Sequence, residues 1–237
     1  AQYEMRNDGL DNPVSKASDS PWGNLTVVES AASCASLGAE YSLISNEEWM
    51  TIARNIESNP INWSEGAVGQ GFLNRGHSND SFTGPCDSLI PILGADCSTS
   101  GSGHEQKRTH TLTNGSVIWD LAGNVSEWVN WTVLPSEKAY ASSDSGTVYA
   151  WRELTLIDSN ILNTSKMRSE SWRSENPALS SAQNIGRYYS GAGAFEAAGV
   201  RGGRWENHIS SGIYSLDLDY DLTDYYRGIG FRCVFKP

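Results

Sequence analysis

Residues 120–129 read DLAGNVSEWV, the most specific stretch of this sequence. Two carboxylates, Asp120 and Glu127, flank a turn that contains Gly123. A hard cation such as Ca²⁺ takes several oxygen ligands at about 2.3–2.6 Å, and a glycine-bearing turn between two acids offers both negative charge and exposed carbonyl oxygens. The alternative is a turn held by side-chain hydrogen bonds without an ion. The chemistry of the stretch is therefore compatible with a bound calcium ion.

Upstream of this stretch, the sequence predicts two α-helices with the same start signal. Thr26 and Ser45 each begin a capping box, TVVE and SNEE, in which the hydroxyl accepts from the first turn and the glutamate reaches back to the cap. The first helix is expected to end at Gly38 and the second before Pro60. The expected apolar positions are Val28, Ala31, Ala32 and Ala35 in the first helix and Trp49, Ile52, Ala53 and Ile56 in the second.

Strand patterns follow in the second half of the chain. Residues 109–119 predict a hairpin around Asn114-Gly115, the strongest short turn signal in the sequence. Residues 214–219 alternate like a strand with one wet face, and residues 229–235 alternate again.

Residues 134–195 are rich in Ser, Asn and Tyr without clear periodicity, so we expect long loops there. No linker, repeat or low-complexity tract divides the chain. The sequence therefore predicts one α+β domain over residues 1–237, with two helices, a small sheet and much irregular chain.

Charge and hydropathy exclude several classes of partner. The 17 basic and 28 acidic residues give a net charge of −11, which repels phosphate backbones and anionic lipids unless a basic patch intervenes. The densest basic run is the pair Lys107-Arg108, and no apolar stretch approaches the roughly 20 residues that cross a bilayer. We therefore expect neither nucleic-acid binding nor membrane insertion. The chain opens Ala1-Gln2-Tyr3, without an initiator Met or a signal peptide, so a processed form is expected.

The four cysteines are Cys34, Cys86, Cys97 and Cys233, and they form no C-x-x-C pair. This spacing argues against a zinc knuckle or a thioredoxin-type motif, so disulfides are the favoured use. A bridge between Cys86 and Cys97 would close a Gly/Pro-containing loop, and one between Cys34 and Cys233 would tie the first third of the chain to its end. The alternative is four buried thiols in a cytosolic protein. Because disulfides follow oxidising compartments, we expect an extracellular or cell-surface location.

Four stretches together resemble the formylglycine-generating enzyme, or sulfatase-modifying factor, family. They read SLISNEEW at 42–49, DLAGNVSEW at 120–128, RGGRW at 201–205 and GFRCV at 230–234, and they occur in the order of the family. The resemblance implies a variant of the C-type lectin fold, with two helices and a small twisted antiparallel sheet in a loop-rich body. It also implies a secreted or cell-surface protein, as in many members.

The resemblance implies a structural calcium ion and one disulfide. The implied calcium ligands are the side chains of Asp120 and Glu127 and the carbonyl oxygens of Gly123 and Val125. The family has a structural disulfide at the positions of Cys34 and Cys233, which favours that pairing over the others.

The catalytic cysteines of the family are missing. Catalytic members carry two cysteines, five positions apart, shortly after the RGGxW stretch, and these bind copper. Residues 206–214 contain no cysteine, and Asn, Ser or a single His does not replace a two-thiolate copper site. Another branch holds iron with an extra N-terminal domain, for which this chain has no room. We therefore expect a non-catalytic member without copper or iron.

Tyr, Asp, Asn and Arg crowd the segment where the enzymes have their active site. Tyr supplies large contact area at low rotamer cost, and the polar residues add directional hydrogen bonds. Within residues 214–219, Asp217 and Asp219 are expected on one displayed face and the leucines on the other. The predicted ligand-binding residues are Arg204, Glu206, Asn207, His208, Tyr214, Asp217, Asp219, Tyr220, Asp221, Asp224, Tyr225, Tyr226 and Arg227. The alternative is a solvated strand edge.

Three functions remain open. The first is a binding module at the tip of a fibre or phage-like appendage, or a surface receptor, recognising a host or prey surface protein or a glycan. This segment also resembles the variable proteins of diversity-generating retroelements, which end in GFRCV or a similar stretch. The others are an oxidoreductase of the formylglycine type with an unrecognised active site, and a structural extracellular domain. The acidity of residues 205–229 favours a basic partner or a neutral one such as a sugar.

Overall fold

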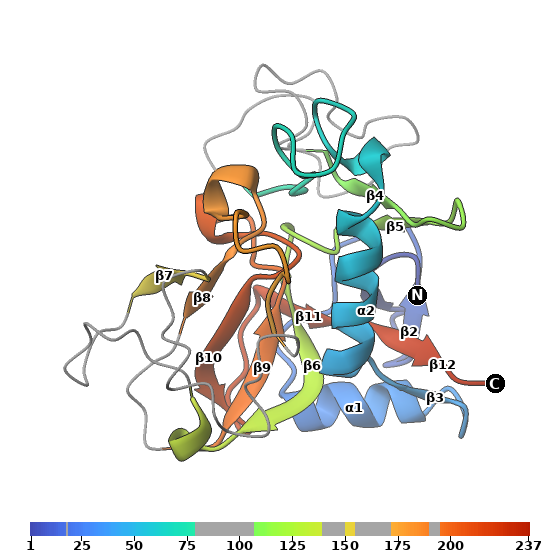
Figure 1. Ribbon diagram of the computed structural model, residues 1–237. Coiled ribbons are helices and arrows are strands. Elements are labelled where there is room, and N and C mark those ends of the chain that lie inside the picture. The colour runs from blue at the N-terminus through green and yellow to red at the C-terminus, as the bar shows by residue number, and fades with distance from the viewer. Residues whose placement is uncertain (18, 79–106, 139–149, 155–171, 190–194) are drawn as a thin grey trace.

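The computed structural model describes residues 1–17, 19–78, 107–138, 150–154, 172–189 and 195–237 (Figure 1). Within these ranges lie two α-helices, α1 (Val27–Ala35) and α2 (Asn46–Glu57). Both predicted capping boxes are present. The N–H of Glu29 donates to Thr26 Oγ1 over 3.1 Å, and the N–H of Glu48 donates to Ser45 Oγ over 3.2 Å. Each glutamate also accepts from the N–H of its cap residue, so the predicted helix starts are confirmed.

The buried face of α1 differs from the expected one. Val28 is 63% exposed, whereas Val27, Ser30 and Cys34 are buried. Cys34 must face Cys233, to which it is bonded, and positions four and seven residues before Cys34 share its side of the helix. The disulfide, rather than the weak pattern of small residues, therefore sets the orientation of α1.

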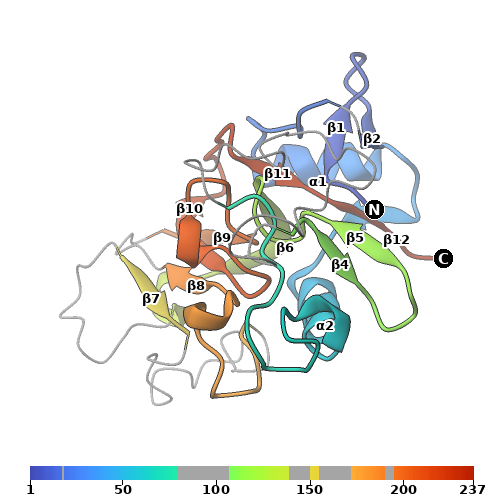
Figure 2. The same ribbon diagram turned by 90° about the horizontal axis from the view of Figure 1, so that it is seen from above.

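A six-stranded sheet forms the main layer, in the order β11-β6-β9-β10-β8-β7 (Figures 1 and 2). Its strands are β6 (Ser126–Val133), β7 (Trp151–Glu153), β8 (Arg187–Tyr189), β9 (Ala197–Arg201), β10 (Leu216–Asp221) and β11 (Ile229–Phe231). The pairs β6–β9, β9–β10 and β7–β8 are antiparallel, and the pairs β11–β6 and β10–β8 are parallel. The α+β class is confirmed, and the main sheet is mixed because long connections bring β11 and β10 back beside strands that run the same way.

Three two-stranded sheets complete the described β-structure. They are β1 (Met5–Asn7) with β2 (Pro13–Ser15), β3 (Tyr41–Leu43) with β12 (Cys233–Phe235), and β4 (Thr109–Thr111) with β5 (Val117–Trp119). The β4–β5 pair is the predicted hairpin. The expected single strand at residues 229–235 is instead two strands, β11 and β12, on either side of Arg232. Residues 134–195, expected as loops, contain β7 and β8.

Short 3-10 helices connect these elements. They are η1 (Pro60–Asn62), η3 (Pro135–Glu137), η5 (Ser181–Gln183) and η6 (His208–Ser210). None of the helices in the described ranges is long and apolar enough to cross a membrane.

Tryptophans anchor the buried core. Trp49 and Trp128 are completely buried, and their indole N–H groups donate to the carbonyl oxygens of Ile213 and Leu25, each over 2.8 Å. A buried indole thereby packs its ring without leaving its donor unpaired. Both α1 and α2 contact β6, the strand that begins inside the candidate calcium loop.

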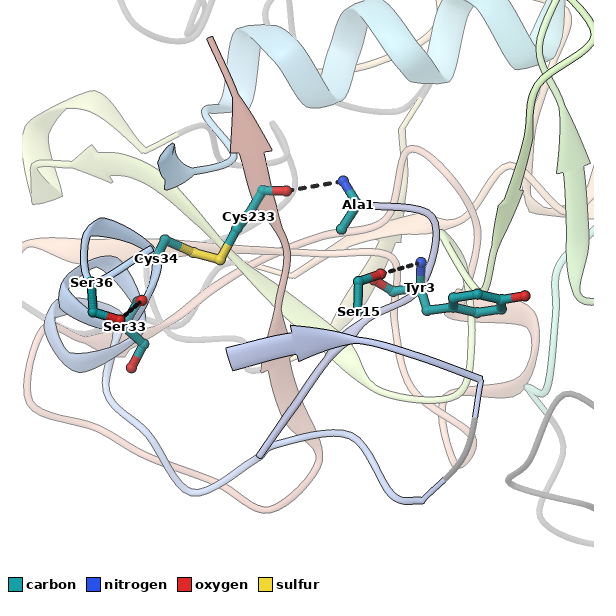
Figure 3. The surroundings of a disulfide bond; sticks show 7 residues. All are labelled: Ala1, Tyr3, Ser15, Ser33, Cys34, Ser36 and Cys233. Carbon is teal, nitrogen blue, oxygen red and sulfur yellow. Dashed lines mark hydrogen bonds between the residues drawn. A yellow bond between two sulfur atoms is a disulfide. The ribbon is translucent and has the colours of Figure 1, made fainter. Parts of the chain in front are cut away.

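Cys34 and Cys233 form a buried disulfide across 199 residues of sequence (Figure 3). Beside it, the amino group of Ala1 donates to the carbonyl oxygen of Cys233 over 3.0 Å. The two ends of the chain lie on the same side of the molecule in Figures 1 and 2. The predicted Cys34–Cys233 pairing is confirmed, whereas Cys86 and Cys97 lie outside the described residues.

Replacing Cys34 and Cys233 together by serine should lower the free energy of unfolding by about 2–5 kcal/mol, because a native disulfide that closes a long loop restricts the unfolded chain. Denaturant unfolding of the oxidised protein and the double variant measures the loss. The Cys86→Ser, Cys97→Ser variant is the matched control for cysteine removal at another site. Equal stability of the oxidised protein and the Cys34→Ser, Cys233→Ser variant would contradict the structural role of the bridge.

Candidate functional site

The loop of residues 120–127 is a buried turn with left-handed backbone. Gly123 and Asn124 have φ angles of +77° and +60°. A Cβ at Gly123 would lie 2.5 Å from the carbonyl oxygen of His77, so only glycine allows this approach. The N–H of Asn124 donates to that same oxygen over 2.6 Å, and the N–H of Gly123 donates to the carbonyl oxygen of Gly202 over 3.4 Å. The loop is thus held between two distant parts of the chain.

Each acid of the loop is paired with a buried arginine. Asp120 accepts from Nε and Nη2 of Arg108 over 2.7 and 2.5 Å, and Glu127 Oε1 accepts from Nε of Arg232 over 2.8 Å. All four side chains are at most 2% exposed. Arg232 also donates through Nη2 to the carbonyl oxygen of Trp119 over 2.6 Å. The sequence patterns contained both arginines but gave no signal that either pairs with this loop.

A third acid, Glu4, reaches the loop from the N-terminal segment. Its Oε1 accepts from the N–H of Val125 over 3.3 Å, and its Oε2 accepts from the side-chain amide of Asn124. Burial raises the pKa of Glu4 well above its usual range, and the two loop acids raise it further. Burial also raises the pKa of Glu127 to about 7, against the effect of Arg232. We call Glu4, Arg108, Asp120, Glu127 and Arg232 the buried charge cluster.

The predicted calcium loop offers oxygen atoms that suit a cation, but it does not surround the site with acidic side chains. Glu127 Oε2 and Asn124 Oδ1 are buried and have no hydrogen-bond partner among the described residues. An ionised carboxylate has about four lone-pair sites, so Asp120 and Glu127 can each accept more than their arginine. No group of three or more His, Cys, Asp or Glu side chains in the described ranges is arranged to hold a metal. Calcium therefore stays a prediction that depends largely on carbonyl oxygens.

The predicted ligand-binding residues divide by exposure. Tyr214 and Asp217 are buried, which contradicts their expected display. The exposed residues are His208, Tyr225 and Arg227, and the half-buried ones are Arg204, Glu206, Asn207, Asp219, Tyr220, Asp221, Asp224 and Tyr226. We call these eleven residues, without Tyr214 and Asp217, the Tyr/Asp surface.

Tyr214, two residues before β10, and Asp217, within it, are buried because both faces of this part of the chain are covered. The edges of β10 pair with β9 and β8, and its residues are buried on both faces up to Leu218. The hydroxyl of Tyr214 donates to Glu57 Oε2 in α2, and burial raises the pKa of Tyr214 far above its usual value. Alternation alone cannot distinguish a strand with one wet face from one covered on both sides.

Arg204 is the centre of the Tyr/Asp surface. Its Nε forms an ion pair with Glu206, and its Nη1 donates to the hydroxyl of Tyr220 over 3.2 Å. Its guanidinium lies over the ring of Tyr226, 4.7 Å from the ring centroid. Tyr220 in turn packs edge-on against Trp128, with ring centroids 5.9 Å apart. The residues predicted from two separate segments are therefore brought together.

Asp221, the last residue of β10, and Asp224, in the turn after it, have a local structural use. Asp221 Oδ1 accepts from the N–H and the hydroxyl of Thr223, and Asp224 Oδ2 accepts from the N–H of Asp221 over 2.8 Å. They shape the turn that leads into Tyr225, whose side chain is 66% exposed. Neither Tyr225 nor Arg227 makes a side-chain hydrogen bond or ion pair within the described residues.

Comparison with known proteins gives one family. A family model described as Sulfatase-modifying factor enzyme 1-like domain matches residues 2–237. No curated protein matches the chain.

Removal of calcium by a chelator should lower the melting temperature, because a cation bound only by the folded state stabilises it. At a free calcium concentration of about 100 times Kd, the expected shift is about 5–10 °C. Glu127→Gln should abolish the calcium-dependent shift, in addition to its own destabilising effect. Glu137→Gln, at an acid outside the loop, is the matched control and should keep the shift. Identical melting curves with calcium and with chelator would show that the loop does not bind calcium.

Asp217→Asn should stabilise the protein at pH 8 and lose that advantage near pH 4. Burial raises the pKa of Asp217 to about 7, against the hydrogen bond that it accepts from the N–H of Asp219; the charge of Asp219 raises the pKa further, and Arg204 and Lys138 lower it. The folded state therefore binds this proton more tightly than the unfolded state, whose pKa is about 3.9, so stability from this group falls as pH rises between these values. Urea unfolding at pH 4.5 and 8 measures the difference, expected to be a few kcal/mol in favour of Asn at pH 8. Equal stability of the two proteins at both pH values would show that Asp217 is not desolvated.

Proposed function

We propose that this chain, which belongs to the sulfatase-modifying factor family, is a ligand-binding member rather than a catalytic one. The absence of cysteine from residues 206–214 supports this proposal, because copper in this family is held by two thiolates. Of the four cysteines, Cys34 and Cys233 are joined to each other and are buried. Copper-dependent oxidation of a cysteine peptide by the purified protein would contradict the proposal.

The observation that carries the proposal is the free pair Tyr225 and Arg227. Both side chains are exposed, and both lack an internal hydrogen bond among the described residues. Tyr and Arg, like Trp, are enriched in binding hot spots, because each offers large contact area with directional donors. The half-buried members of the Tyr/Asp surface would form the rim.

The proposed partner is a protein or glycan on a host or prey surface. Tyr225 can stack on a sugar face or an apolar side chain, and the acids around it accept hydrogen bonds from hydroxyl or basic groups. An extracellular or cell-surface location is part of the proposal, and the Cys34–Cys233 bridge supports it because disulfides persist in oxidising compartments. The proposed calcium ion would stabilise the loop beneath this surface.

Replacing Tyr225 and Arg227 together by alanine should weaken binding at least about thirtyfold, equivalent to about 2 kcal/mol, since hot-spot residues contribute on this scale. Ligands would first be found on glycan and surface-protein arrays, and affinities would then be measured by surface plasmon resonance. Leu10→Ser, at the exposed tip of the β1–β2 hairpin, is the matched control and should bind normally. Unchanged affinity in the double variant would place the binding site elsewhere.

A further inference from the structure

We infer that Arg204 is a positioning residue that holds the two halves of the Tyr/Asp surface, residues 204–208 and 219–227, in one fixed arrangement. The inference rests on the proposed function, because the fixed arrangement would serve ligand binding. Its test uses the unliganded protein and does not depend on that function. Arg204 was predicted to contact ligand directly, and its contacts assign it a different role.

The guanidinium of Arg204 contacts three side chains of the protein. It contacts Glu206 in its own half of the surface, and Tyr220 and Tyr226 in the other half. The side chain is 17% exposed, half the exposure of Glu206. A ligand would therefore meet the groups around Arg204 before it met the guanidinium itself.

The backbone of Arg204 is fixed on the scaffold. Its N–H donates to Asn207 Oδ1 over 2.9 Å, and its carbonyl oxygen accepts from the hydroxyl of Ser211 over 3.0 Å. The next N–H, of Trp205, donates to the carbonyl oxygen of Asn124 in the candidate calcium loop over 3.1 Å. These hydrogen bonds fix the backbone of Arg204, and its side chain extends from there toward residues 219–227.

The segment that carries Tyr225 and Arg227 has a second attachment, to the backbone of Asn24. The N–H of Asn24 donates to the carbonyl oxygen of Tyr226 over 3.1 Å. A Cβ at Gly228 would lie 2.8 Å from both Arg204 Cδ and the Tyr226 ring, so this glycine leaves the space in which the two side chains stack. Residues 222–228 are consequently held by the backbone near Asn24 and by the side chain of Arg204.

Lysine cannot replace arginine in this role. A guanidinium offers a planar fork for Glu206 and Tyr220 and a flat face for Tyr226 at the same time, whereas an ammonium is a compact point charge. The substitution Arg204→Lys therefore keeps the charge and removes the geometry. That makes it a selective test of positioning.

The test is hydrogen–deuterium exchange of the unliganded protein, read by mass spectrometry. Arg204→Lys should speed exchange of the amides of residues 222–228 about tenfold, because loss of one hydrogen bond and the cation–π contact removes roughly that much protection. The amides of α2 should not change. Arg187→Lys is the matched control, since Arg187 also forms a partly buried ion pair, with Glu153 over 2.8 Å, and it should leave residues 222–228 unchanged.

Unchanged exchange in residues 222–228 of a folded Arg204→Lys protein would overturn the inference. If that variant does not fold, Tyr220→Phe removes only the hydroxyl that Arg204 contacts, and unchanged exchange there would overturn it equally. A different result would refute the proposed function. A Tyr225→Ala, Arg227→Ala protein with full affinity would refute the binding site while leaving the exchange result for Arg204→Lys intact.

Discussion

The buried charge cluster is the constraint on which the rest of the structure depends. Its members come from the N-terminal segment, the residues directly before β4 and after β5, the start of β6 and the residue between β11 and β12. Burying several charges is costly unless each is paired, and removal of one partner of a buried pair typically costs about 3–5 kcal/mol. The cluster therefore connects the two ends of the chain, through Glu4 and Arg232, to residues 108–127. The adjacent Cys34–Cys233 bridge fastens α1 to the same place.

The Tyr/Asp surface is in direct contact with the loop that contributes acids to the buried charge cluster. The N–H of Trp205 donates to the carbonyl oxygen of Asn124, and Tyr220 packs on Trp128, one residue after Glu127 of the cluster. The fold is that of a member of the sulfatase-modifying factor family. In the function that we propose, the residues displayed at 204–227 bind a ligand, and a rigid scaffold beneath them would keep the ordering cost of binding small.

Local signals in the sequence predicted the features that depend on neighbouring residues. The capping boxes at Thr26 and Ser45 and the hairpin at Asn114-Gly115 form as expected, because hydrogen bonds over two to four residues decide them. The predictions that failed concern features set by contacts between residues that are distant in the sequence. The buried face of α1 follows a disulfide, and both faces of β10 are buried up to Leu218 by residues that are distant in the sequence, which no period-two pattern encodes. The pairing of Glu127 with Arg232, 105 residues away, likewise had no local signal.

The most direct test of this account is a double-mutant cycle between Glu127 and Arg232, read as the free energy of unfolding. Each single change, Glu127→Gln or Arg232→Met, leaves a buried charge unpaired and is expected to cost about 3–5 kcal/mol. The double variant leaves no such charge, so it should be more stable than the sum of the single losses predicts, by about 2 kcal/mol or more. Strictly additive losses would contradict the claim that the cluster acts as one unit on which the fold depends.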